Sequence, residues 1–211
     1  MGAVLTDYPS RSGMIIWGAI FALVLGWSAI TPKDYPTWWL EVFPALAGAG
    51  ILYFTRRRFP LTRLVYVLIL VHCIILIVGG HYTYAEVPLF DMLREPMGWE
   101  RNNYDKVGHL AQGFVPAIIA REVLLRLSPL ERGGWLTLFV GSLCLAISAF
   151  YELIEWWVAL LSDEAAESFL GTQGYVWDTQ SDMGWALIGV ILALLLLRGR
   201  HDRELAARGF C

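Results

Sequence analysis

Charged side chains are scarce in this sequence, and long apolar runs take their place. Asp, Glu, Lys and Arg make up 17% of the 211 residues, while 57% are hydrophobic and 14% aromatic. A typical soluble domain has about 25% charged and about 45–50% apolar residues. These proportions argue against a soluble enzyme and against a disordered tail, and the net charge of −3 is too small to indicate nucleic-acid binding. The composition therefore predicts an integral membrane protein.

Cysteine is also rare, and its placement excludes a disulfide scaffold. Cys73 and Cys144 lie inside apolar runs and Cys211 is the last residue, so neither a pairing pattern nor a metal-type spacing is visible. The sequence likewise has no internal repeat and no low-complexity linker. We therefore expect a single integral membrane domain over residues 1–211.

Six segments are apolar over the length that a bilayer requires, which is about 20 residues for a helix. They are residues 14–31, 37–54, 64–80, 104–126, 134–161 and 179–197. The first is too long for the apolar region of a signal peptide and has no A-x-A cleavage site, so we expect it to remain as a helix. The sequence thus predicts an all-α fold, a polytopic bundle of six transmembrane helices.

The basic residues divide unevenly between the two sides of such a bundle. Twelve of the 16 lie on the side of the two termini, which six spans place together: Arg11, Arg56, Arg57, Arg58, Arg63, Arg121, Arg126, Arg132, Arg198, Arg200, Arg203 and Arg208. The other side has Lys33, Arg94, Arg101 and Lys106. Because Lys and Arg accumulate in cytoplasmic loops, we expect both termini in the cytoplasm. The loops over residues 82–103 and 162–178 then face outward.

Histidine and carboxylate side chains gather near the outer ends of four spans. Counted at about 1.5 Å per residue from the cytoplasmic side, they lie about 24 to 32 Å up in a hydrocarbon core about 30 Å thick. The set is His81, Asp105, His109, Glu152, Glu155, Asp178 and Asp182. Ionisable residues inside a membrane are costly and usually functional. We expect them to line one outward-facing pocket, the alternative being charges that meet headgroups and water.

Six of these side chains form pairs at helical spacing, which places each pair on one face of its helix. The pairs are Asp105 and His109, Glu152 and Glu155, and Asp178 and Asp182. Imidazole and carboxylate groups are ligands that suit a divalent cation such as Zn or Mn, so all seven members of the set are candidate metal ligands. The candidate catalytic residues are His109, Glu152, Asp178 and Asp182.

Further side chains border the predicted pocket. Gln112 lies one turn from His109 and is placed to orient its ring. Glu41 either joins the pocket or reaches the interface, and His72 lies mid-membrane, where packing, metal ligation and proton relay are the alternatives. Lys106 is placed either to screen the charge of the pocket or to hold an anionic headgroup, and the aromatic residues of the outward loops are either functional or ordinary interface anchors. The candidate substrate-binding residues are Lys106, Tyr82 and Trp177.

Four stretches resemble the YjdF-type family of bacterial inner-membrane proteins. They are Gly79–Pro88, Tyr104–His109, Tyr151–Trp156, and Gly171–Gly174 followed by Trp177–Met183. The resemblance covers most of the chain from about Leu64 onward. It implies a multi-pass protein of the bacterial inner membrane and supplies no activity.

A second, more distant resemblance is to the VanZ-like family, which is linked to glycopeptide-antibiotic resistance. Asp105, Lys106 and His109 match its Asp-Lys-x-x-His pattern, and a glutamate on a later helix matches its second part. The third part departs from the pattern, because Asp182 stands four residues after Asp178 where that family has Asn. This resemblance implies a polar cluster that acts on envelope lipid or wall intermediates.

Three classes of function are compatible with these features. The first is a membrane-embedded, metal-dependent hydrolase or transferase, or a metal-free acid–base enzyme, acting on a lipid or lipid-linked headgroup. The second is an ion or solute transporter, which usually places its site at mid-membrane and is often built from repeats. The third is a structural or assembly subunit of a membrane complex, for which ten tryptophans and many small residues suit helix packing.

Overall fold

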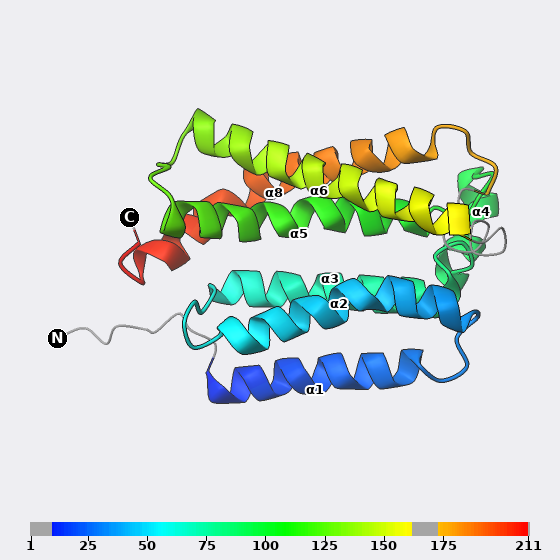
Figure 1. The fold of residues 1–211 in the computed structure, drawn as a ribbon, viewed down its shortest axis with the longest axis horizontal. Helices are drawn as coiled ribbons and strands as arrows, with labels where there is room; N and C mark the ends of the chain where they lie inside the picture. The colour runs from blue at the N-terminus through cyan, green and yellow to red at the C-terminus, as the bar shows by residue number, and fades with distance from the viewer. Residues whose placement is uncertain (1–9, 162–172, 211) are drawn as a thin grey trace.

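The computed structural model describes residues 10–161 and 173–210, and every regular element in these ranges is a helix (Figure 1). The helices are α1 (Arg11–Ser28), α2 (Tyr35–Thr55), α3 (Arg63–Tyr82), α4 (Pro88–Met97), α5 (Tyr104–Leu127), α6 (Gly134–Leu161) and α8 (Asp178–Ala206). Helices α1, α2 and α3 form one half of the bundle, and α5, α6 and α8 form the other. The short helix α4 lies at the end opposite the start of α1 and the end of α8 (Figure 1).

Each of the six predicted spans corresponds to a helix, which confirms the all-α prediction. Four of these helices, α1, α3, α6 and α8, have the length and hydropathy of membrane spans. Helix α5 is a weaker candidate because charged residues stand in its first and last turns. The six-span count and the cytoplasmic placement of both termini stay predictions, and residues 162–172 of the predicted outer loop lie outside the described residues.

Two segments differ most from the sequence prediction. Residues 88–97, expected as part of a loop, form α4, because Pro88 is favourable at the first helical position and Gly98 ends the helix with a φ of 65°. Helix α8 continues to Ala206 instead of ending at residue 197. Its last turns are held by burial of His201 and Leu205, both 0% exposed, against the rest of the bundle.

The seam between α5 and α8 is the most extensive helix contact in the described chain. Two glycines make it possible: a Cβ atom at Gly113 would overlap the carbonyl oxygen of Ala186, and one at Gly189 would overlap that of Leu110. The two backbones are therefore in direct contact, as small residues allow between membrane helices. This close approach places the polar side chains at each end of α5 next to those of α8.

A sharp turn after α3 brings an aromatic ring into the bundle. Thr83 and Tyr84 both have positive φ values, of 56° and 55°. The turn folds the ring of Tyr84 back between α3 and α5, where it occupies the space over Gly79 and Gly108 that a Cβ atom on either would need. Tyr84 consequently lies beside the polar side chains of α5.

Candidate functional site

Six of the seven predicted metal ligands come together at the α4 end of the bundle. All six are at most 9% exposed. They form two groups, His109 with Glu152 and Glu155, and Asp105 with Asp178 and Asp182, and in each group one ligand atom per residue lies within 4.8 Å of the others. We call these six residues the acidic cluster. Its members come from α5, α6 and α8, as the helical spacing predicts.

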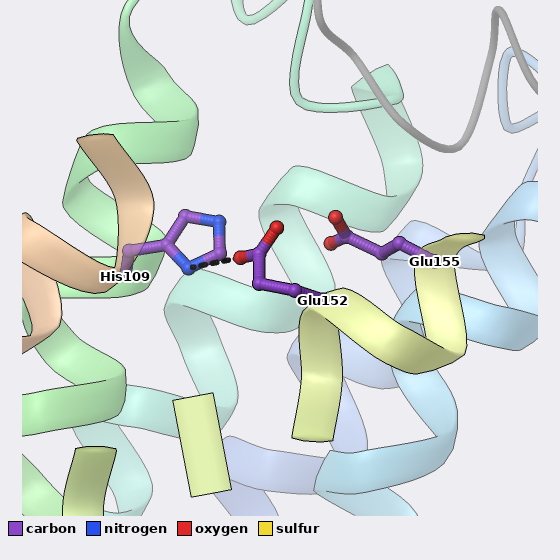
Figure 2. Close-up of side chains that lie close together, drawn as sticks. All are labelled: His109, Glu152 and Glu155. Atoms are coloured by element: carbon purple, nitrogen blue, oxygen red, sulfur yellow. Dashed lines mark ion pairs between the residues drawn. The ribbon is translucent and has the colours of Figure 1, made fainter. Parts of the chain in front are cut away.

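His109 links the two groups. Its Nε2 atom lies 3.7 Å from Oδ2 of Asp182, and its Nδ1 atom lies 3.9 Å from Oε1 of Glu152 (Figure 2). Nδ1 is also 3.2 Å from Oε1 of Gln112, the side chain expected to orient the ring. In a neutral ring, donation from Nδ1 to this amide oxygen leaves the lone pair of Nε2 directed at Asp182. A cation between Nε2 and Asp182 would meet two suitable ligand atoms.

The carboxylates of α6 extend the group on the other side of His109. Glu152 lies between His109 and Glu155, with its carboxylate directed at the imidazole (Figure 2). Within the described part of the chain, Oε1 of Glu152 and Oδ1 of Asp182 are buried without a hydrogen-bond partner. Because an unsatisfied buried acceptor is costly, these two oxygens mark the place where a further group would stabilise the protein most.

Arg101 is a member of the site that the sequence reading assigned only to the outer loop. Its guanidinium pairs with Asp105 and donates to Oδ1 of Asp178 at 2.5 Å. Burial lowers the pKa of Arg101 and the charges of Asp105 and Asp178 raise it, and the net pKa lies above its ordinary value. Arg101 is therefore a fixed cation that compensates these two carboxylates, whereas no ion pair with Arg or Lys is seen for Asp182 among the described residues. Its position four residues before Asp105 is the signal that could have revealed it.

A cavity of about 190 Å³ adjoins the acidic cluster and reaches toward the middle of the bundle. Glu41 of α2, one of the alternatives left open by the sequence, lines it and accepts a hydrogen bond from Tyr151 at 3.3 Å. Tyr84 and His72 also line it, and Nε2 of His72 has no hydrogen-bond partner in the described ranges. The cavity thus joins the acidic cluster to the single histidine of mid-α3.

His81, the seventh predicted ligand, lies elsewhere. Its Nδ1 atom is 2.9 Å from the carbonyl oxygen of Ser28, and its ring centroid is 4.5 Å from that of Trp27. The predicted depth of His81 along α3 does not determine which way its side chain faces. In the structure the side chain faces α1. The structure therefore does not bring His81 to the acidic cluster.

The three predicted substrate-binding residues do not all lie in one place. Lys106 is half-buried next to Asp105, and its Nζ atom lies 5.9 Å from the ring centroid of Tyr175. Trp177 is 63% exposed and directly precedes Asp178, so it lies at the edge of the acidic cluster. Tyr82 lies with His81 and Trp27 on the α1 side of the bundle, away from the other two.

The comparisons with known proteins agree with the fold. The family model described as "Predicted membrane protein (DUF2238)" matches residues 13–203. This chain belongs to the DUF2238 family. It is also 48% identical over 187 residues to the inner membrane protein YjdF of Escherichia coli (strain K12), a match that covers 89% of this chain and 90% of the relative. No solved structure matches the chain.

These matches confirm the YjdF-type resemblance, and with the apolar helices they support a multi-pass protein of the inner membrane. Neither match supports the VanZ-like resemblance, which stays a prediction. Neither description names an activity, so the function of this DUF2238 protein has to be argued from its side chains.

A second group of buried polar residues lies at the other end of the DUF2238 bundle. Glu122 of α5, fully buried, accepts hydrogen bonds from the backbone and hydroxyl of Thr62 at 3.0 and 2.6 Å, and from Arg126 at 2.7 Å. His201 of α8 lies 3.1 Å from Glu122 through Nε2 and 3.0 Å from Arg121 through Nδ1. We call these five residues the Glu122 network. Both ring nitrogens and both carboxylate oxygens have partners, so this network is a structural connection between α5, α8 and the start of α3.

Proposed function

We propose that the acidic cluster binds a divalent cation and that the protein is a membrane-embedded hydrolase or transferase acting on the headgroup of an envelope lipid. The observation that carries the proposal is that Glu152 and Asp182, which lie on either side of His109, each bury one oxygen that has no hydrogen-bond partner among the described residues. A cation between Nε2 of His109 and the carboxylate of Asp182 would give Asp182 a partner and offset the mutual repulsion of the carboxylates. An imidazole with two or three carboxylates is a donor set that suits Zn or Mn.

The neighbouring side chains support a division of labour. His109, through Nε2, and Asp182 would hold the cation, with Glu152 on the Nδ1 side of the ring. When bound, the cation would polarise a phosphoryl or carbonyl oxygen. Glu155, the outer member of the α6 pair, would take a proton from the attacking water or hydroxyl group and return it to the leaving oxygen. In hydrolysis, the water oxygen forms the new bond to phosphorus or carbon as the bond to the leaving oxygen breaks. Lys106 and Trp177 would contact the headgroup.

The shape of the cavity favours a lipid substrate that enters sideways. Helix α2 packs on α3, and α6 packs on α5 and α8, while α2 and α6 share no extensive packing in the described chain and are linked by the hydrogen bond from Tyr151 to Glu41. Pro44 and Ile147, which lie near the middle of α2 and α6, line the cavity, and Ile147 is 42% exposed. An opening at this depth faces hydrocarbon, because the middle of a spanning helix lies within the bilayer core. Acyl or isoprenoid chains can occupy it while the headgroup reaches the acidic cluster.

Metal analysis of the purified protein tests the proposal. The wild-type protein, loaded with Zn or Mn and freed of excess metal, is expected to retain about one equivalent per chain by elemental mass spectrometry. His109→Ala and Asp182→Asn are expected to retain none. His81→Ala is the matched control, because His81 lies outside the acidic cluster, and it is expected to retain the metal as the wild type does.

Turnover is measured with vesicles of an inner-membrane lipid extract, followed by mass spectrometry of the lipids. The expected result is a change in headgroup mass that requires the added metal and disappears in Asp182→Asn. A wild-type protein without retained metal, or metal retention that survives both cluster substitutions, would contradict the metal site. Metal retention without any change in the lipids would contradict the enzymatic part alone.

One observation favours a second candidate, proton or ion transport. The cavity connects the acidic cluster to His72, whose Nε2 atom is unpartnered in mid-membrane. Such a chain of titratable groups is the arrangement of a proton pathway. Proton flux into proteoliposomes that His72→Ala abolishes, with no change in lipid mass, would favour transport over the enzyme.

A further inference from the structure

A second hollow, unrelated to the acidic cluster, lies at the end of the bundle that holds the Glu122 network. It is a groove of about 650 Å³ between the start of α6 and the second half of α8. Three arginines, Arg121, Arg132 and Arg198, line it together with one carboxylate, Asp202. Asp202 accepts hydrogen bonds from Arg121 and Arg132, both at 2.7 Å. Three guanidinium groups against one carboxylate leave the groove with a surplus of positive charge.

Arg198 carries the part of this charge that faces outward. It is exposed on α8, and within the described residues no hydrogen bond or ion pair engages its side chain. The first turn of α6 begins beside it at Gly133 and Gly134, which also line the groove. The unpaired backbone N–H groups of that turn add a partial positive charge.

The other half of the groove is apolar. Ile191 and Leu195, seven and three residues before Arg198, lie on the same face of α8 and are 48% and 65% exposed. They belong to a helix with the hydropathy of a membrane span. The lining of the groove therefore changes from guanidinium groups at the end of the bundle to exposed aliphatic side chains toward the middle of the bundle. A phospholipid has the same order, with its phosphate at one end and its acyl chains beyond it.

An exposed tryptophan gives the level of the groove in the bilayer. Trp135, the second residue of α6, is 70% exposed beside the two glycines. Tryptophan prefers the boundary between headgroups and hydrocarbon. Arg132, three residues before Trp135, is then near the height of lipid phosphates, and basic pockets between membrane helices at this height suit anionic headgroups.

We propose that this groove binds an anionic phospholipid, with the phosphate between Arg198 and Arg132 and an acyl chain along Ile191 and Leu195. The occupant is a lipid because a soluble anion would leave the aliphatic half of the groove empty. It is anionic because a zwitterionic headgroup brings no net charge to offset the surplus of arginine. The site is independent of any activity of the acidic cluster.

Native mass spectrometry of the full chain, released from detergent with phosphatidylglycerol or phosphatidylethanolamine added, tests this proposal. The wild-type protein is expected to retain phosphatidylglycerol in preference. Arg198→Gln is expected to weaken retention about fivefold, since one basic residue near a membrane surface contributes about 1 kcal/mol. Arg132→Gln combined with Arg198→Gln is expected to abolish the preference, and Arg198→Lys to restore most of it.

Arg203→Gln is the matched control, because it removes the same charge from the same helix at an exposed position outside the groove. Its retention of phosphatidylglycerol is expected to equal that of the wild type. Equal losses in Arg203→Gln and Arg198→Gln would overturn the proposal in favour of a diffuse charge effect. The proposal would also be overturned if the Arg198→Gln protein melts at the wild-type temperature and keeps its full preference for phosphatidylglycerol. Displacement of the lipid by an equal concentration of soluble glycerol phosphate would overturn it as well.

Discussion

The acidic cluster and the Glu122 network both combine histidine and carboxylate side chains of α5 and α8, yet their polar atoms are satisfied to different degrees. Both bury a histidine and a glutamate or aspartate along the seam between α5 and α8. In the Glu122 network, His201 and Glu122 contact each other and are surrounded by donors. In the acidic cluster, His109 faces Asp182 at 3.7 Å, and oxygens of Asp182 and Glu152 have no partner in the described chain.

This difference separates a structural role from a functional one more clearly than residue type does. In the Glu122 network both ring nitrogens of His201 and both carboxylate oxygens of Glu122 have partners, although Nε of Arg126 has none in the described chain. A buried network satisfied to this degree rigidifies a fold, and removal of one partner leaves the others unpaired. A half-satisfied group of carboxylates costs stability unless a ligand completes it. Functional sites commonly carry such a cost, which is why we propose a function for the acidic cluster and a structural role for the Glu122 network.

The largest effect is expected when the Glu122 network is broken. Glu122→Ala leaves Arg126, His201 and Thr62 buried without their shared acceptor, a loss expected to lower the free energy of unfolding by about 3–5 kcal/mol. Thermal melting in detergent measures it. Glu131→Ala, which removes an exposed glutamate from the loop before α6, is the control and is expected to melt as the wild type does. If the two variants melt alike, the network does not hold α5, α8 and α3 together.

An intermediate effect is expected at Arg101, the one compensated part of the acidic cluster. Arg101→Gln removes the cation between Asp105 and Asp178, and we expect the free energy of unfolding to fall by about 1.5–3 kcal/mol. Denaturant titration followed by tryptophan fluorescence measures it. Arg94→Gln is the control, because Arg94 is exposed on α4 and pairs weakly with Asp91 at 3.8 Å. A loss no greater than that of the control would mean that Asp105 and Asp178 need no compensating cation.

The smallest effect on stability is expected where the proposed effect on function is greatest. Asp182→Asn keeps the size of the side chain and removes a buried charge that pairs with no Arg or Lys in the described part of the chain. In the metal-free protein, it is expected to change the free energy of unfolding by about 1 kcal/mol or less, or to raise it. Glu122→Gln, the same kind of change in the Glu122 network, is expected to destabilise the protein clearly. Equal destabilisation by both changes would remove the distinction between the two regions.

Much of the arrangement could be predicted from the sequence, because hydropathy and helical spacing are local properties. The six predicted spans all appear as helices, and the i,i+3 and i,i+4 pairs of α5, α6 and α8 lie in one cluster. Helix α4 was missed because a short amphipathic segment between two spans reads as an interfacial loop. His81 was misplaced because counting residues gives a depth along a helix but not the direction in which a side chain faces.

The members found only in the structure show the same limit. Arg101 was counted as a basic residue of the outer side. Its position four residues before Asp105 indicates a contact with that residue, but nothing local indicates that it also reaches Asp178 of α8. Tyr84 enters the bundle through a turn with positive φ, and the residues of this turn do not predict such a conformation. Glu122 and His201 lie 79 residues apart, so their contact depends on the close packing of two helices.

The scarcity of charge determined that this chain enters a membrane, and the spacing of the few ionisable residues determined which of them share a helix face. Both follow from the sequence, because the cost of burying a charge and the period of a helix apply to every chain. Only the tertiary structure decided which of these residues are satisfied and which are left open. That outcome depends on the backbone contact at Gly113 and Gly189, which sets where α5 meets α8 and hence which side chains can reach one another.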